Sequence, residues 1–349
     1  MYILENVPLT AYSTMRLGGL AAHLTEVTNK HDLHEALAWA NERGLPAIMI
    51  GEGSNLIWND DGYPGLVIVN KISGFEVTGE FDSSTYVTAG SGLHWDSFVE
   101  KTVEMGLTGL EFLSLVPGTV GATPVQNVGA YGAEVASTIT TIEAYDSQTK
   151  AFVTLRGDEC QFGYRTSRFK TVDRGRFFIT SVTFGLQKGS PEPPFYNALQ
   201  TYLREKNITD YTPASIREAV IAIRSAKLPD PAVVANNGSF FANPIIDADS
   251  FTQLQADFPD IAHWEVEDGK IKLSAAWLLE QAGFKDAHDQ ETGMGTWPAQ
   301  PLVLVNEHAE KTAQLIAFRD KIIATVLQKF NVTLQQEPEL ILYRDILNT

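Results

Sequence analysis

Hydrophobic and polar positions along this chain change repeatedly between helix and strand periodicity. Leu33, Ala36 and Ala40 share one helical face, and Gly44 stands where a helix commonly ends. The apolar run 47–50 that follows has the length of a short buried strand. This order predicts an α+β unit at the start of the chain.

A second mixed unit follows. Strand-like alternation at 86–89 precedes a helix whose inner face holds Trp95 and Val103, and the clearest later strand is 177–184. The segment 189–194 is rich in Gly, Ser and Pro, which is typical of a linker between domains.

Beyond this linker the pattern is mainly helical. Ser215 and Glu218 have the spacing of a capping box at the start of one helix, which Pro229 ends. A second helix is predicted to begin near Ser274, and the longest to span 307–330. We therefore predict three α+β units, at residues 1–70, 71–190 and 191–349.

The amino-acid composition narrows the range of possible functions. The chain has 349 residues with 44% hydrophobic and 20% charged residues, as in globular proteins, and a net charge of −17. That charge argues against broad nucleic-acid binding, so an anionic ligand would need a few local Lys and Arg side chains. Cys160 is the one cysteine, which excludes an internal disulfide and favours a reducing compartment.

No targeting or metal signal is visible. The chain begins without a signal-peptide pattern, and no apolar run approaches the roughly 18 residues of a membrane span. The seven histidines lack HxxxH and HExxH spacing, so no metal site is expected. We expect a cytoplasmic monomer without membrane or nucleic-acid partners.

The run PGTVGATPVQNVGAYG at 117–132 is the most informative segment. It holds four glycines and two prolines and no charge. Because Gly permits positive φ and Pro removes an N–H donor, we predict a loop whose bare main chain holds a phosphorylated or planar ligand. The alternative is a tight structural turn, although such turns are usually richer in Asp, Asn and Ser.

The run GEGSN at 51–55 is a second glycine-rich segment after a strand. It is not a dinucleotide fingerprint, because Leu56 replaces the third glycine and no long amphipathic helix follows. Its amides form either an anion nest or a plain turn.

Four polar residues are candidates for chemistry. Arg165 beside Tyr164 offers a planar cation for a carboxylate or enolate, against the alternative of a solvated arginine. Lys227 either compensates a helix end or binds a phosphate. Ser239 stands between a glycine and two aromatic residues, and it either faces a desolvated pocket or caps a helix. Glu339 stands at the start of an apolar strand, where its carboxyl group is either buried or solvated.

Taken together, these segments resemble the UDP-N-acetylenolpyruvoylglucosamine reductase (MurB) family. The matching segments cover nearly the whole chain: 13–19, 51–55, 117–132, 164–170, 227–231, 238–244, 300–306 and 337–339. The segment 194–197 is similar to the mobile loop of the type I form. Departures from the commoner pattern are Ser13, Ala122, Thr123, Leu340 and Ile341.

The resemblance implies an α+β fold with an FAD-binding part of PCMH type, made of two α+β subdomains, and a C-terminal α+β substrate domain. It implies non-covalent FAD, NADPH as hydride donor and reduction of UDP-N-acetylglucosamine enolpyruvate to UDP-N-acetylmuramate in peptidoglycan precursor synthesis. The sequence leaves open the oligomeric state and the preference for NADPH over NADH.

The resemblance also implies roles for individual residues. The catalytic group would be Arg165, Ser239 and Glu339, with Ser239 as the general acid. Substrate would contact Tyr164, Tyr196, Lys227, Asn243 and Gln300. FAD would contact Gly51, Gly53, Ser54, Asn55, Pro117, Gly118, Val120, Gly121, Thr123, Gln126, Asn127, Gly129, Ala130, Tyr131 and Ile179.

Two other functions compete with this one. A different flavin oxidoreductase, such as an alcohol oxidase, would have no need for Ser239 and Glu339, because it protonates no carbanion. A non-catalytic nucleotide-sugar binding protein would be colourless when purified.

Overall fold

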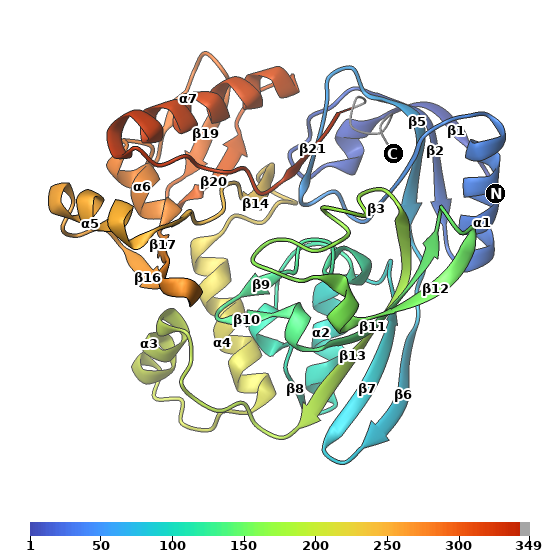
Figure 1. Ribbon diagram of the computed structural model, residues 1–349, viewed down its shortest axis with the longest axis horizontal. Helices are drawn as coiled ribbons and strands as arrows, with labels where there is room; N and C mark the ends of the chain where they lie inside the picture. Colours follow the sequence, from blue (N-terminus) through green and yellow to red (C-terminus); the bar gives the residue numbers. More distant parts are fainter. Residues whose placement is uncertain (343–349) are drawn as a thin grey trace.

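The computed structural model describes residues 1–342 and contains mixed helices and sheets, as the predicted α+β class requires (Figure 1). The last seven residues of the predicted third unit lie outside this range. Among residues 1–342, no helix has the length and apolar character that crossing a membrane requires.

The first elements build a four-stranded sheet with one helix against it. They are β1 (Leu4–Pro8), β2 (Leu20–Val27), α1 (Lys30–Glu42), β3 (Ala47–Ile50), β4 (Leu56–Trp58) and β5 (Tyr63–Asn70). The sheet order is β1-β2-β5-β3, and β2 and β3 both run parallel to β5. Helix α1 packs Leu33, Ala36 and Ala40 against the sheet, and Gly44 follows its end at φ +62°, as predicted. The parallel β3 carries the chain straight into the 51–55 segment.

The second sheet has six antiparallel strands. Its order is β12-β11-β13-β7-β6, with β8 paired to β13. Helix α2 buries Trp95, Phe98 and Val99 against this sheet, which matches the predicted inner face. The elements are β6 (Phe75–Phe81), β7 (Ser84–Gly90), α2 (Trp95–Glu104), β8 (Leu107–Thr108), β9 (Gly129–Ala130), β10 (Ala133–Glu134), β11 (Ile139–Asp146), β12 (Ala151–Arg156) and β13 (Phe177–Lys188).

Most of the third group of elements packs around one core, in which α7 buries Leu315, Phe318 and Ile322 and to which Met15, Leu17 and Ile57 also contribute. Helices α3 and α4 form a separate cluster against Phe112 and Tyr131. Its sheets have the orders β14-β20-β19-β18 and β15-β17-β16. The elements are α3 (Asn197–Glu205), α4 (Pro213–Lys227), β14 (Asn236–Ser239), β15 (Ile245–Ile246), α5 (Ala248–Asp257), β16 (His263–Glu265), β17 (Ile271–Leu273), α6 (Ala275–Gln281), β18 (His288–Asp289), β19 (Met294–Trp297), β20 (Gln300–Asn306) and α7 (Thr312–Phe330).

One further strand connects the end of the chain to its beginning. Strand β21 (Glu339–Ile341) extends from the third group toward the first elements of the chain (Figure 1). There it pairs parallel with β4. The amide of Glu339 donates to the carbonyl of Asn55 at 3.0 Å, and Ile341 joins the core of the first group. This pairing places Glu339 next to the 51–55 segment.

Two predicted helix starts are wrong. Helix α4 begins at Pro213, and its cap is Thr212, whose hydroxyl accepts from the Ser215 amide at 3.1 Å; the predicted capping box at Ser215 and Glu218 is therefore one turn too late. Helix α7 begins at Thr312 and not at 307. The predicted start of α6 at Ser274 is confirmed, since that side chain accepts from the Trp277 amide.

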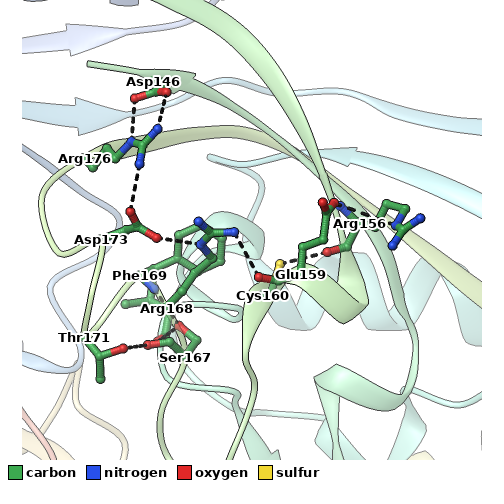
Figure 2. A network of polar contacts seen from close by, with 11 residues as sticks. Asp146, Arg156, Glu159, Cys160, Ser167, Arg168, Phe169, Thr171, Asp173 and Arg176 are labelled. Carbon is green, nitrogen blue, oxygen red and sulfur yellow. Dashed lines mark hydrogen bonds and ion pairs between the residues drawn. The ribbon is translucent and has the colours of Figure 1, made fainter. Parts of the chain in front are cut away.

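A chain of ion pairs fixes the segment that leads into β13 (Figure 2). Arg176 donates to both carboxylate oxygens of Asp146, each at 2.8 Å, and to Asp173 at 3.1 Å. Asp173 also accepts from Arg168 Nε at 2.7 Å. Hydrogen bonds from Arg176 hold the pKa of Asp146 well below its ordinary value.

Acid should therefore weaken this anchor. Because the pKa of Asp146 is lower in the folded than in the unfolded chain, the pair stabilises the fold above the ordinary aspartate pKa of 3.8 and is lost as the pH falls below it. We expect Asp146→Asn to lower Tm at neutral pH by roughly 2–6 °C and by less in acid. The control is Asp158→Asn in the exposed pair with Arg156, which should change little. An equal loss at both pH values would contradict this account.

Candidate functional site

A cavity of about 850 Å³ is lined by residues from all three groups of elements, which is large enough for an extended cofactor and part of a substrate. Its wall includes the loop after β3, the glycine-rich run before β9, the segment 164–179, the β14 turn and β21. The two glycine-rich segments and the predicted Arg165, Ser239 and Glu339 thus meet at one cavity.

The two glycine-rich segments form one continuous wall. The Gly118 amide donates to Glu52 at 3.1 Å, and the Ser54 hydroxyl donates to the Pro117 carbonyl at 3.4 Å. Gly53 has φ +69°, and a Cβ at that position would lie 2.2 Å from the Tyr12 carbonyl oxygen, so no larger residue fits. Close packing of the two loops leaves their main chain, with few side chains, facing the cavity.

Arg165 is held over this wall by three contacts. A tight turn joins Gly163 and Thr166 and gives Arg165 a φ of +55°. Its Nη2 donates to the Gly129 carbonyl at 2.7 Å, and its Nε lies 3.2 Å from a carboxylate oxygen of Glu337. The guanidinium also lies 5.1 Å from the ring centre of Tyr164. The cation is therefore fixed in place at the cavity.

Glu337 was not among the predicted site residues. Burial raises the pKa of its carboxyl group, and the nearby Arg165 and Lys170 oppose that rise. Its amide donates to the Phe240 carbonyl at 2.8 Å, so it is tied to the chain that carries Ser239. The only signal in the sequence was its place two residues before Glu339.

Ser239 and Glu339 both line the cavity, with Arg165, but their surroundings differ from the expectation. Ser239 ends β14, so the helix-cap alternative is wrong. Ser239 is exposed and its hydroxyl makes no hydrogen bond to the described residues, so the alternative of a desolvated pocket is wrong as well. Glu339 accepts from Arg174 Nε at 2.7 Å.

Asn237, two residues before Ser239, fixes the β14 turn to the first glycine segment. Its Nδ2 donates to Thr14 Oγ1 at 3.1 Å and to the Ser54 carbonyl at 3.2 Å, and its Oδ1 is buried without a partner among the described residues. Asn237 also lines the cavity.

Most of the other predicted residues lie on the cavity wall. These are Gly51, Gly53, Ser54, Asn55, Pro117, Gly118, Gly121, Thr123, Gln126, Gly129, Ala130, Ile179, Tyr164 and Asn243. Six predicted residues are not on the wall: Val120, Asn127, Tyr131, Tyr196, Lys227 and Gln300. Val120 and Asn127 belong to the glycine-rich run, but both are buried. Asn127 Nδ2 donates to a carboxylate oxygen of Glu134 at 2.7 Å.

Arg224, rather than Lys227, reaches the cavity from α4. Lys227 is exposed at the end of the helix, while Arg224 lines the wall and its Nε is buried without a partner among residues 1–342. Burial lowers the pKa of Arg224, and the neighbouring Tyr131 opposes this. Tyr131 in turn packs edge-on against Tyr196 at 5.9 Å. The substrate role of Lys227 was implied by the resemblance, while its residue type and place left a helix-end cation and a phosphate partner open; Arg224 was not singled out.

Cys160 is buried, and burial raises the pKa of its thiol to about 11, so it is a neutral thiol at physiological pH. It does not line the cavity. Within residues 1–342, no group of His, Cys, Asp and Glu side chains could hold a metal ion.

Comparison with known proteins agrees with this arrangement. The FAD binding domain family matches residues 21–152, and the family described as UDP-N-acetylenolpyruvoylglucosamine reductase, C-terminal domain, matches residues 230–341. UDP-N-acetylenolpyruvoylglucosamine reductase from Alcanivorax borkumensis is 40% identical over 338 residues, covering 97% of this chain and 96% of the relative. The enzyme of the same name from Ralstonia nicotianae is 40% identical over 337 residues, covering 96% and 98%.

The fold has a solved counterpart. The crystal structure of UDP-N-acetylenolpyruvylglucosamine reductase (MurB) from Thermus caldophilus has a TM-score of 0.67 and 21% identity, and covers 97% of this chain and 99% of that one. It confirms the predicted fold. The two relatives, each 40% identical over nearly the whole chain, show that the chain belongs to the UDP-N-acetylenolpyruvoylglucosamine reductase family.

Proposed function

We propose that this protein reduces the enolpyruvyl group of UDP-N-acetylglucosamine enolpyruvate to give UDP-N-acetylmuramate, with NADPH as hydride donor and non-covalent FAD as cofactor. The reaction belongs to peptidoglycan precursor synthesis. The observation that carries the proposal is the convergence of Arg165, Ser239 and Glu339, from three distant parts of the chain, on one cavity with two glycine-rich walls.

The cavity residues fit FAD. The packed segments 51–55 and 117–130 present main chain and small side chains, which suit a diphosphate and a flat ring system. A Cβ at Gly51, Gly53 or Gly121 would lie 2.5 Å or less from a neighbouring atom, so these three glycines cannot be replaced without collision. We assign FAD binding to these segments and to Ile179. The units at 1–70 and 71–190 would hold the cofactor, and the unit at 191–349 the substrate.

Bound FAD would supply hydride transfer, by which a hydride taken from NADPH would reach C3 of the enolpyruvyl ether. Arg165 offers a fixed positive charge where negative charge develops on the substrate carboxylate and C2. Ser239 then donates its hydroxyl proton to C2, and Glu339 orients the reacting groups. Serine is a weak acid in water, so this transfer would need a cation to compensate the charge left on its oxygen, a role we assign to Arg165.

The substrate diphosphate needs a cation, because the chain carries a net charge of −17. We assign this role to Arg224, whose Nε is buried without a partner among the described residues and whose neighbour is Tyr131. Asn243 lies on the same cavity wall, whereas Tyr196 and Gln300 lie off it and stay predicted substrate contacts. Lys227 does not line the cavity.

Arg224→Gln should therefore raise KM for the UDP-sugar by about tenfold to a hundredfold, the order of a lost charged hydrogen bond, with a smaller effect on kcat. The matched control on the same helix is Lys227→Gln, for which we expect a smaller rise. Steady-state kinetics with varied nucleotide sugar measures both. A larger KM effect at Lys227 would contradict the assignment to Arg224.

A product assay tests the function itself. Purified protein with NADPH and the enolpyruvyl nucleotide should give a product heavier by two hydrogens, identified by mass spectrometry. Rapid oxygen consumption with a small alcohol would favour the oxidase alternative, and colourless protein would favour a binding protein. We also propose that the chain acts as a cytoplasmic monomer, which light scattering tests for the oligomeric state.

A further inference from the structure

We propose that Arg174 is a positioning residue that holds the carboxylate of Glu339 at the reaction centre. The inference rests on the proposed function, because it concerns how a group of that site is aimed. Arg174 lies in the segment before β13, outside the residues that the family resemblance singled out.

The contact is direct and joins two distant parts of the chain. Arg174 Nε donates to Glu339 Oε1 at 2.7 Å, and its Nη2 lies 2.5 Å from the same oxygen. Both residues line the cavity. Because both contacts go to Oε1, the other oxygen is left for a second partner, such as a substrate group or a hydroxyl.

Stability alone does not explain the pair. The side chains are 38% and 28% exposed, and an ion pair with that exposure contributes little to folding. A pair of this kind matters when it fixes the direction of a functional group, since a misplacement of about 1 Å can cost a large factor in rate.

The backbone on both sides of the contact is fixed, so the pair has a defined geometry. Asp173, immediately before Arg174, is held by Arg168 and by Arg176, which is bound in turn to Asp146 (Figure 2). The Arg174 amide donates to the Thr171 carbonyl at 3.2 Å. On the other side, β21 is paired with β4. The position of the Arg174 backbone relative to Glu339 is therefore fixed by these contacts.

Three basic residues of the segment 165–174 contact two different acidic residues of the site. Arg165 lies 3.2 Å from a carboxylate oxygen of Glu337, and Lys170 donates to the Glu337 carbonyl at 3.4 Å, while Arg174 takes Glu339. Each acid therefore has its own basic partner. Arg174 thus holds the Glu339 carboxylate, while the acid partner of Arg165 is Glu337.

A double-mutant cycle tests the proposal. We would measure FAD affinity and, by stopped-flow absorbance, flavin reduction by NADPH and its reoxidation by the enolpyruvyl nucleotide. Arg174→Gln should leave FAD affinity and flavin reduction near wild type and slow reoxidation by about tenfold, whereas Arg174→Lys should recover most of the rate. In an E339Q background, R174Q should have no further effect. The control is Arg156→Gln, an exposed arginine paired with Asp158.

The outcomes separate this proposal from the proposed function. If R174Q slowed reoxidation equally with and without Glu339, Arg174 would act independently of it and the proposal would be wrong. A loss of FAD affinity in both R174Q and R174K would also overturn it, because Arg174 would then hold the cofactor. If E339Q were slow and R174Q normal, only the positioning role would fail; if E339Q were normal, the catalytic role of Glu339 would fail with it.

Discussion

Ser239→Ala should leave flavin reduction by NADPH intact and slow the second half-reaction by about 10²- to 10⁴-fold, the usual contribution of a general acid. The reason is that Ser239 has a hydroxyl on the cavity wall that no other described residue engages, so it is free to donate to the substrate. Removing it takes away the proton for C2 but no contact that the fold requires. Anaerobic stopped-flow absorbance follows the two half-reactions separately.

The control for this experiment is Ser190→Ala, an exposed serine in the linker after β13 that does not line the cavity. Its two half-reactions should match wild type. Normal turnover by Ser239→Ala in a coupled assay would show that another group, or water, supplies the proton.

Arg165→Gln should produce the second large effect, a fall in the rate of substrate reduction of about 10²- to 10³-fold. Glutamine keeps hydrogen-bonding capacity near Gly129 but removes the positive charge that faces the developing enolate. The change also leaves Glu337 buried without its cation, so thermal melting must be measured in parallel.

A second substitution separates charge from stability. Arg165→Lys retains the charge but not the planar fork, and should recover part of the rate. The matched control is again Arg156→Gln, which removes an exposed guanidinium far from the cavity wall. Equal activity of Arg165→Gln and wild type, with both folded, would rule out a role in stabilising charge.

The sequence alone predicted correctly those helices and strands that have a strong local pattern of hydrophobic positions. Strand β3 agrees with the predicted run 47–50, and α2 buries the predicted Trp95 and Val103, because amphipathic periodicity reports directly which face meets the core. Helix starts were less certain: Thr212 rather than Ser215 caps α4, since both are good capping residues and Pro213 favours the earlier start.

The sequence alone could not predict which strands pair when they lie far apart along the chain. Strand β21 has three residues, too few for any periodicity, and nothing local indicates that it pairs with β4 nearly the whole chain away. The same limit explains the missed site residues. Glu337 and Arg174 are defined by partners from other segments, Arg165 and Glu339, which only the folded chain brings close.

The absorbance spectrum of the purified protein under anaerobic conditions is the most direct test of the central claim, that the shared cavity carries a flavin facing Arg165, Ser239 and Glu339. The protein should be yellow, lose its flavin absorbance on addition of NADPH, and regain it on addition of UDP-N-acetylglucosamine enolpyruvate. A protein that binds no flavin, or whose reduced flavin is unchanged by the enolpyruvyl nucleotide, would contradict the account.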